Sequence, residues 1–449
     1  MLIILPAFLD KMTIIDVDSS DDSFVAPRRN KELSRDSEKL VKFSRSELLL
    51  IKNRNVKCSS DFNLKVRERH PDIADIILRT ENHDESKVDK DNKFWEIEKQ
   101  KEWDDEILDL LRNVPTLSND DQIMSLVNML RGPRQRMELI SSLVSDIESC
   151  LKREFPHCSI IPYGSTSTGF AFQDSDLDAF VDLQLKSLTS VGKSTDEEEN
   201  RGRHTRTSLV AEYLRKEERF RSAHPILHAR IPIVKMRDRV TGIKCDINVV
   251  CNMGVKNSEF LNYCRSLDTR CEYLVSVVKY IAIRQGMVGS GPGDHLNSYT
   301  VVLMVIFFLQ VGGILPSVEI LQTGVKADVI NGWNCAFDKD FDLNEWKEIN
   351  SPNQEGSISK LLKDFFKFYI CFPYDTHIIC PLLGSPVKKY NLKLGYNLPR
   401  SLQKAPHFGK KKEKLEVNKS LVIQDPFELT RNVAVGISKA HFSKFNYNS

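Results

Sequence analysis

Two aspartates in the middle of the chain have the residue type and the spacing for metal chemistry. Asp176 and Asp178 lie two positions apart in the segment 176–185, whose odd-numbered positions are all apolar. A strand has a period of two, so both carboxylates lie on the face opposite the core. Carboxylates this close repel each other unless a cation lies between them. The pair therefore suits Mg²⁺, which prefers carboxylate oxygens and usually binds together with substrate phosphates.

A third aspartate, Asp246, lies in a second alternating segment. Between 243 and 250 the odd-numbered positions are again apolar, and Asp246 lies on the other face. If this segment pairs with the segment 176–185, Asp246 completes a two-metal site. The alternative is purely structural: Asp176 and Asp178 place charge on a solvent-exposed edge strand.

A Gly-Ser pair precedes the two aspartates. Gly164 and Ser165 form a turn with Gly169, and Ser165 lies eleven residues before Asp176. Such a turn lets backbone N–H groups and a hydroxyl approach phosphate oxygens. With the strand aspartates that follow it, this order of motifs resembles the nucleotidyltransferase superfamily related to DNA polymerase β.

Further motifs resemble the noncanonical poly(A)/poly(U) polymerase family, which includes RNA terminal uridylyltransferases. They follow the family's order over residues 135 to 440, at 245–248, 257, 267–270, 278–280, 297–304, 332–334 and 423–433. The resemblance implies an α+β fold. A polymerase-β-like nucleotidyltransferase sheet with helices is expected, followed by a mostly helical PAP-associated domain, with a cleft between them.

The resemblance also implies roles for the aspartates. Asp176 and Asp178 are expected to hold two Mg²⁺ ions, with Mn²⁺ as a substitute. Asp246 is expected to bind one ion and to help deprotonate the RNA 3′-hydroxyl. One ion lowers the pKa of that hydroxyl, and the other stabilises the triphosphate and the leaving pyrophosphate.

Nine residues are expected to form the nucleotide site by the same resemblance. The phosphates are expected at Gly164, Ser165, Lys279 and Ser298, the ribose or the base O2 edge at Asn257, and the base at Tyr299, with Asp425, Glu428 and Arg431 around its far edge. One position departs from the family, because Ile283 occurs where a second lysine is usual, and Arg284 follows it.

Arg431 bears on the choice of nucleotide. Uridylyltransferases of the family commonly have a His six residues after the position of Asp425, and this chain has Arg431 there. Arginine only donates hydrogen bonds, so it matches the O4 acceptor of uracil and opposes the N6 donor of adenine. An unpaired buried donor costs about 1–3 kcal/mol, which favours UTP over ATP. The alternative is that Arg431 points at phosphate or RNA.

The function expected from these residues is terminal uridylyltransfer. UMP from UTP is added to RNA 3′ ends by two-metal catalysis. One alternative is a poly(A) polymerase that uses ATP, and another is a catalytically weak RNA-binding scaffold. The basic segments 201–206 and 404–412 are candidate RNA contacts or merely solvated loops. RNA-decay or RNA-binding proteins are the expected protein partners.

The composition limits the class of protein. The 449 residues include 64 Lys and Arg against 62 Asp and Glu, which argues against a wholly basic coat protein. The ten cysteines contain no Cys-x-x-Cys pair, which indicates free thiols in a reducing compartment. The apolar run 301–309 is shorter than a membrane span. We expect no membrane association and a cytoplasmic location, with a nuclear pool as the alternative.

Several elements must position the site. We expect a disordered tail at 1–93, a helical lead-in at 94–134, a nucleotidyltransferase catalytic domain at 135–256 and a PAP-associated domain at 257–440. Strands are predicted at 177–185, 227–236 and 243–250, the last two as a hairpin, with a surface loop at 193–206. Helices are predicted after a cap at Asp268, from Ser298 to Gln310, and over 358–369.

Overall fold

The computed structural model describes residues 118–184, 196–289, 295–350, 356–394, 415–438 and 442. The predicted tail 1–93 and the basic segment 404–412 lie outside the described residues. The predicted lead-in 94–134 is described only from residue 118 onward. The segments that carry the predicted site residues are all described.

One five-stranded sheet carries Asp178 and Asp246, and Asp176 directly precedes one of its strands. Its strands, in spatial order, are β1 (Ser159–Tyr163), β2 (Leu177–Asp182), β5 (Lys244–Asn248), β4 (Ile233–Arg237) and β3 (His224–Ile226). β2 and β5 are parallel, and the other neighbouring strands are antiparallel. The predicted hairpin is confirmed, because β4 pairs directly with β5.

Two predicted strand limits are wrong. The strand predicted over 227–236 begins only at Ile233, directly after Pro232. Proline has no N–H to donate, so it is poorly placed inside a ladder. β2 ends at Asp182, before the predicted end, because Gln184 has a φ of 50° and its N–H donates to the Asp182 side chain. That local turn leads the chain out of the sheet.

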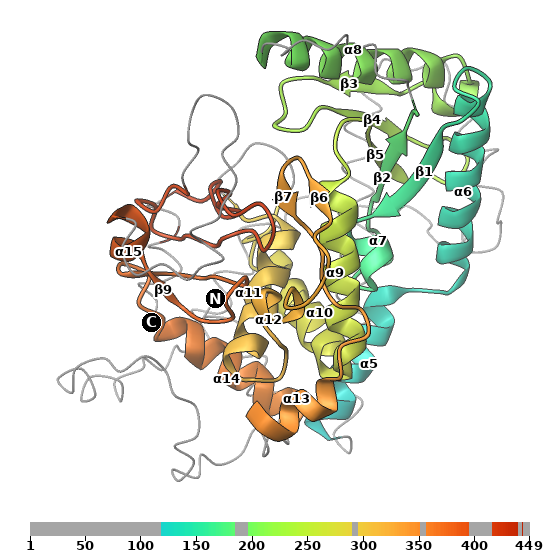
Figure 1. Cartoon of the computed structure of the whole chain (residues 1–449). Helices are drawn as coiled ribbons and strands as arrows, with labels where there is room; N and C mark the ends of the chain where they lie inside the picture. Colours follow the sequence, from blue (N-terminus) through green and yellow to red (C-terminus); the bar gives the residue numbers. More distant parts are fainter. Residues whose placement is uncertain are drawn as a thin grey trace.

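The prediction of a surface loop at 193–206 is wrong, because residues 196–206 are helical. Helix α8 (Asp196–Arg215) lies along β3 and β4 (Figure 1). Its second half buries Val210, Ala211 and Leu214 against the sheet. Charged residues dominate the first half, which has no apolar stripe of its own. Packing of the second half stabilises the whole helix, as is usual for helices of modest propensity.

The core of the sheet lies between its apolar face and helices α6 (Gln135–Lys152) and α8. As predicted, the odd positions Leu177, Ala179 and Val181 of β2 are fully buried. Their burial leaves the even positions of β2, including Asp178, on the opposite face.

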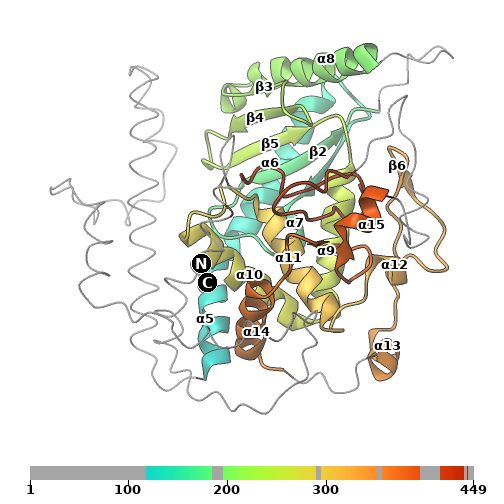
Figure 2. The same ribbon diagram turned by 90° about the vertical axis from the view of Figure 1, so that its left-hand side faces the viewer.

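The rest of the described chain is mainly helical and forms a separate apolar core. The longer helices of this core are α5 (Asn119–Arg131), α9 (Met253–Leu267), α10 (Thr269–Arg284), α11 (Ser298–Val311) and α14 (Ile358–Ile370). Figure 2 shows the sheet and α8 above this helical part. The α+β architecture predicted from the sequence is therefore confirmed.

Local signals set the ends of two of these helices. Asp268 caps α10 by accepting from the N–H of Arg270, as predicted. The side chain of Asn297 caps α11, which starts at the predicted Ser298. α11 is buried on nearly all sides, and no helix in the described ranges is long and apolar enough to cross a membrane.

Short elements connect these helices and strands. They are α7 (Ser165–Thr168), η3 (Glu218–Phe220), α12 (Val318–Leu321), β6 (Val329–Ile330), β7 (Trp333–Asn334), α13 (Leu343–Asn350), β8 (His377–Ile378), β9 (Val387–Lys388) and α15 (Lys389–Leu394). β6 and β7 form a hairpin whose two-residue turn has positive φ at Asn331 and Gly332. An Asn-Gly pair is the preferred sequence for such a turn.

Candidate active site

A cavity of about 1400 Å³ lies between the sheet and the helical part. Residues of β1, β2 and β5 form one wall, and residues of α9, α10 and α11 form the other. Small-molecule pockets usually measure about 300–1,000 Å³. The cavity therefore has room for more than a single nucleotide.

Asp178 and Asp246 lie directly opposite each other on the parallel strands β2 and β5. One oxygen of Asp246, Oδ2, is 3.3 Å from Nζ of Lys235 on β4. The other, Oδ1, is buried and has no hydrogen-bond partner among the described residues. Burial, and then the charges of Asp246 and Asp176, raises the pKa of Asp178 to about 7.

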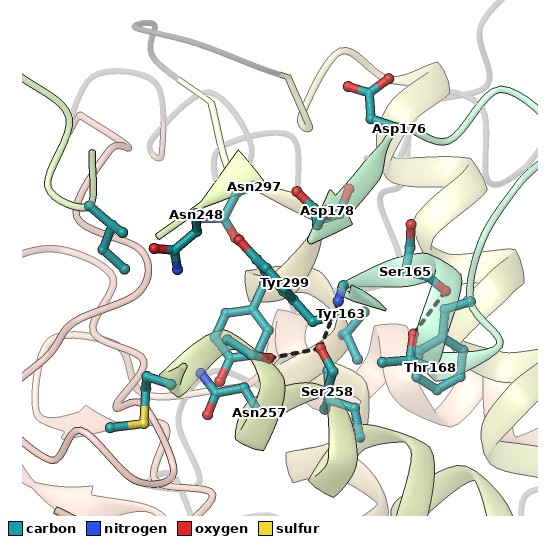
Figure 3. Close-up of a pocket in the computed structure, with 18 of the residues that line it drawn as sticks. Tyr163, Ser165, Thr168, Asp176, Asp178, Asn248, Asn257, Ser258, Asn297 and Tyr299 are labelled. Atoms are coloured by element: carbon teal, nitrogen blue, oxygen red, sulfur yellow. Dashed lines mark hydrogen bonds between the residues drawn. The ribbon is translucent and has the colours of Figure 1, made fainter. Parts of the chain in front are cut away.

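Asp176 lies just before β2, and Figure 3 shows its carboxylate apart from that of Asp178. Burial raises the pKa of Asp176, while Lys244 opposes the rise. In the part of the chain that the structure describes, no three His, Cys, Asp or Glu side chains are close enough to hold a metal ion as they stand. The charges still fit a divalent cation, which would satisfy Oδ1 of Asp246 and relieve the repulsion at Asp178.

Gly164 has a φ of 73° and lies against Asp178. A Cβ at this position would lie 2.3 Å from Oδ2 of Asp178, so a larger residue would displace that carboxylate. Ser165 begins α7 directly after Gly164, and both residues line the cavity. The N–H of Gly164 donates to Oγ of Ser258 at 2.7 Å. This N–H is therefore not free for a phosphate, in contrast to the expectation from the sequence.

Two predicted nucleotide contacts come from α9 and α10. Asn257 is 7% exposed and lines the cavity, and its Oδ1 has no partner within the described ranges. Such an acceptor is suited to a ligand that donates a hydrogen bond. Nζ of Lys279 donates to the carbonyl of Phe170 at 3.0 Å and lies 4.4 Å from the centroid of the Phe172 ring. Burial lowers the pKa of Lys279 to about 8.

A buried carboxylate organises the residues around Tyr299. Asp425 is fully buried, and its Oδ2 accepts from the Tyr299 hydroxyl at 3.2 Å and from Nη1 of Arg431 at 3.3 Å. Its Oδ1 accepts from the backbone N–H groups of Phe427 and Glu428. Asp425 therefore fixes the Arg431 guanidinium at the cavity wall, 5.9 Å from the centroid of the Tyr299 ring.

The structure brings most of the predicted nucleotide residues to this one cavity. Among the predicted residues, the cavity is lined by Gly164, Ser165, Asp176, Asp178, Asn257, Lys279, Ser298, Tyr299, Glu428 and Arg431. Asp246 and Asp425 lie next to lining residues rather than on the surface of the cavity. Ile283 lines the cavity, and the neighbouring Arg284 is not among the lining residues.

Sequence reasoning missed the lining residues Arg230 and Ser258, and named a third, Arg203, only as part of a candidate RNA contact. Arg230 lies between β3 and β4 and forms an ion pair with Glu428. Arg203 lies on α8, inside the basic segment 201–206 that was a candidate RNA contact. Ser258 is adjacent to Asn257. Composition indicated only Arg203, because the other two reach the cavity through long-range packing.

Two family models match the chain. Residues 120–266 match the central palm domain of mitochondrial-like poly(A) RNA polymerases, and residues 357–431 match the Cid1 family poly A polymerase domain. The two matches fall on the sheet with its helices and on the region that ends at Arg431. Together they include the three aspartates, Asp425 and Arg431, whereas Tyr299 lies between the two matched ranges.

Curated relatives include polymerases of both nucleotide preferences. The Speckle targeted PIP5K1A-regulated poly(A) polymerase of Xenopus tropicalis is 27% identical over 73% of this chain and 43% of its own length. The mitochondrial poly(A) RNA polymerase of Homo sapiens is 26% identical over 82% of this chain and 60% of its own length. Terminal uridylyltransferase 7 of Homo sapiens is 26% identical over 66% of this chain and 18% of its own length. The chain thus spans less than two thirds of each of these relatives.

Solved structures share the fold. mtPAP in complex with UTP superposes with a TM-score of 0.61 at 22% identity, over 76% of this chain and 68% of that chain. The Cid1 poly(U) polymerase with Mg 3′-dATP bound superposes with a TM-score of 0.56 at 23% identity, over 73% of this chain and 91% of that chain. These similarities confirm the nucleotidyltransferase fold.

Proposed function

Because the chain belongs to the noncanonical poly(A)/poly(U) polymerase family, we propose that it extends RNA 3′ ends without a template. The register of Asp178 and Asp246 beside a cavity lined by Lys279 carries this proposal. Opposed carboxylates suit a divalent cation, and a lysine suits a triphosphate. Nucleotidyl transfer needs both at one site.

The three aspartates are the residues that would hold Mg²⁺, with Mn²⁺ as a substitute. When bound, such ions supply positive charge that lowers the pKa of the attacking hydroxyl and stabilises the leaving pyrophosphate. The unpaired Oδ1 of Asp246 and the raised pKa of Asp178 support this assignment to Asp176, Asp178 and Asp246.

The protein's own groups orient the reactants. Asp246 accepts the proton of the RNA 3′-hydroxyl, and the 3′-oxygen bonds to the α-phosphorus while the bond to the pyrophosphate oxygen breaks. Ser165 and Ser298 donate hydroxyl hydrogen bonds to phosphate oxygens, and Lys279 supplies positive charge beside them. The unpaired Oδ1 of Asn257 accepts from a ribose hydroxyl. Holding the reactants in line is most of the catalysis in phosphoryl-type transfer.

UTP is the proposed nucleotide. Tyr299 is the stacking platform for the base, and Arg431 lies beside it with its guanidinium held by Asp425. An N–H of Arg431 pairs with O4 of uracil and faces the N6 donor of adenine. Uracil therefore gains a hydrogen bond from Arg431, whereas adenine leaves the buried N–H donor of Arg431 unpaired.

The second candidate is a poly(A) polymerase that uses ATP. Nη1 of Arg431 lies 3.3 Å from Asp425 and 4.0 Å from Glu428. These two carboxylates compete with a base for the guanidinium, which weakens the argument for uracil. Two of the relatives above are also named poly(A) polymerases.

Primer extension tests the function. The full chain is incubated with a labelled short RNA, Mg²⁺ and each nucleoside triphosphate in turn, then with equal UTP and ATP. We expect the enzyme to add uridine. If it prefers to add adenosine, the proposed nucleotide is ATP instead of UTP. If no nucleotide is incorporated, the enzymatic proposal fails. Retention of the same RNA in a gel shift would then favour the RNA-binding scaffold.

The proposed location is the cytoplasm, where RNA-decay or RNA-binding proteins would deliver the RNA. All nine cysteines of the described ranges are free thiols, which supports a reducing compartment. A nuclear pool is the alternative, and relatives carry names that refer to speckles and mitochondria. Imaging of the tagged full chain in cells checks the assignment.

A further inference from the structure

Ser258 connects helix α9 to the turn before α7. Its side chain is almost fully buried, with 6% of the residue exposed. Oγ accepts from the N–H of Gly164 at 2.7 Å and donates to the carbonyl of Gly254 at 2.9 Å. Figure 3 marks both bonds as dashed lines that meet at the labelled Ser258. A hydroxyl has a single hydrogen to donate. Because that hydrogen is used within α9, the oxygen is oriented as an acceptor toward Gly164.

A second contact lies one helical turn away on the same face of α9. A Cβ at Gly254 would lie 2.8 Å from Cε2 of Tyr163, so the helix backbone packs directly against that ring. Residues four apart lie on one face of a helix. Gly254 and Ser258 therefore hold two consecutive residues, Tyr163 and Gly164, against α9.

The turn is also confined on its other side. Gly164 lies between Ser258 and the carboxylate of Asp178, which a Cβ on Gly164 would displace. Any shift of the Gly164 backbone would therefore move Ser165 and press on Asp178. Ser258 follows Asn257 directly in α9, so the same helix sets the distance between this turn and the Asn257 side chain.

We propose that Ser258 is a positioning residue, which acts through Gly164 to hold Ser165 where the triphosphate binds. The inference rests on the proposed function, in which Ser165 contacts the outgoing phosphates. Without the Ser258 hydroxyl, the N–H of Gly164 loses its partner and the turn is held on one side only. Because Ser165 contacts the phosphates directly, the larger effect falls on nucleotide binding, and the displacement of Asp178 has a smaller effect on the chemistry.

Ser258→Ala tests the proposal in the full chain. We expect KM for UTP and for ATP to rise about tenfold, with a smaller change in kcat. Unfolding of part of the sample would instead lower the apparent kcat and leave KM unchanged. Ser258→Thr keeps an oxygen that bonds to the carbonyl four residues earlier in a helix, so it restores KM. Ser276→Ala on α10, also buried, is the control and keeps KM unchanged.

The outcomes separate the two proposals. If the wild-type chain incorporates no nucleotide, the proposed function fails. If it is active and Ser258→Ala keeps KM within twofold, the positioning role is wrong. If circular dichroism shows Ser258→Ala unfolded, the test passes to Gly254→Ala and Ser258→Thr. A raised KM in Gly254→Ala together with a wild-type KM in Ser258→Thr supports the positioning role. Any other result overturns it.

Discussion

Arg230 and Glu428 form an ion pair across the cavity, although 198 positions separate them in the chain. Arg230 comes from the segment between β3 and β4, and Glu428 from the region that matches the Cid1 family domain. The pair therefore links the segment between β3 and β4 to the C-terminal region beside the proposed nucleotide site. Half of the Arg230 side chain is exposed, so water and salt weaken the attraction.

We expect Arg230→Gln to change the free energy of unfolding by less than about 1 kcal/mol, because exposed ion pairs contribute little. The difference from wild type should shrink further in high salt. Urea unfolding at two salt concentrations measures both effects. Arg153→Gln, which removes an exposed pair with Glu217, is the control of the same kind. A loss of several kcal/mol would show that the pair is structural.

Asp176→Ala combined with Asp178→Ala should reduce nucleotide incorporation at least about a thousandfold. Metal-held charge contributes several kcal/mol to such reactions, and each 1.36 kcal/mol is tenfold in rate. Single-turnover primer extension measures the loss. Asp182→Ala is the control, because Asp182 lies at the far end of β2 and bonds to Gln184. Equal losses in both variants would contradict the assignment.

Arg431→Ala should reduce any preference for UTP over ATP about ten- to hundredfold, since the proposed base-reading donor is removed. The ratio of kcat/KM for the two nucleotides measures this effect. Arg431→Lys keeps the charge near Asp425 but loses the planar fork, so it should retain only part of the preference. If the ratio is unchanged in Arg431→Ala, another residue selects the base.

Asp238 should make stability depend on acid pH. It is fully buried, and although burial raises its pKa, hydrogen bonds from Arg219 and Thr241 outweigh burial and lower the pKa overall. A carboxylate with a lowered pKa stabilises the fold above its unfolded pKa of about 3.9. That contribution is lost as the pH falls through the lower folded pKa.

The variant Asp238→Asn separates this contribution from general acid unfolding. At neutral pH it should lose about 1–3 kcal/mol, because the hydrogen bonds from Arg219 and Thr241 weaken while Arg219 keeps its pair with Asp146. Its stability should then fall less steeply than that of wild type below pH 4. Thermal unfolding between pH 2 and 7 measures both, with Asp146→Asn as the control, since Asp146 is a more exposed partner of Arg219. If the stability of Asp238→Asn and of wild type falls in parallel with pH, Asp238 is not the source of the acid dependence.

The sequence alone determined the features that depend on neighbouring residues. Alternation predicted the buried face of β2, and Leu177, Ala179 and Val181 are fully buried. Capping residues predicted the start of α10 at Asp268 and of α11 at Ser298. Strand periodicity and helix caps act within a few residues, so the local sequence contains the whole signal.

Only the tertiary structure decided which groups the site residues meet. The N–H of Gly164 bonds to Ser258, 94 positions away, and is therefore not free for phosphate. The charge-rich start of α8 is helical because the apolar stripe after it packs on the sheet. Arg230 reaches Glu428 only when the sheet and the C-terminal region face one cavity. A polar group bonds to whichever partners lie within hydrogen-bond distance, and the packing of elements that are distant in the chain decides which partners those are.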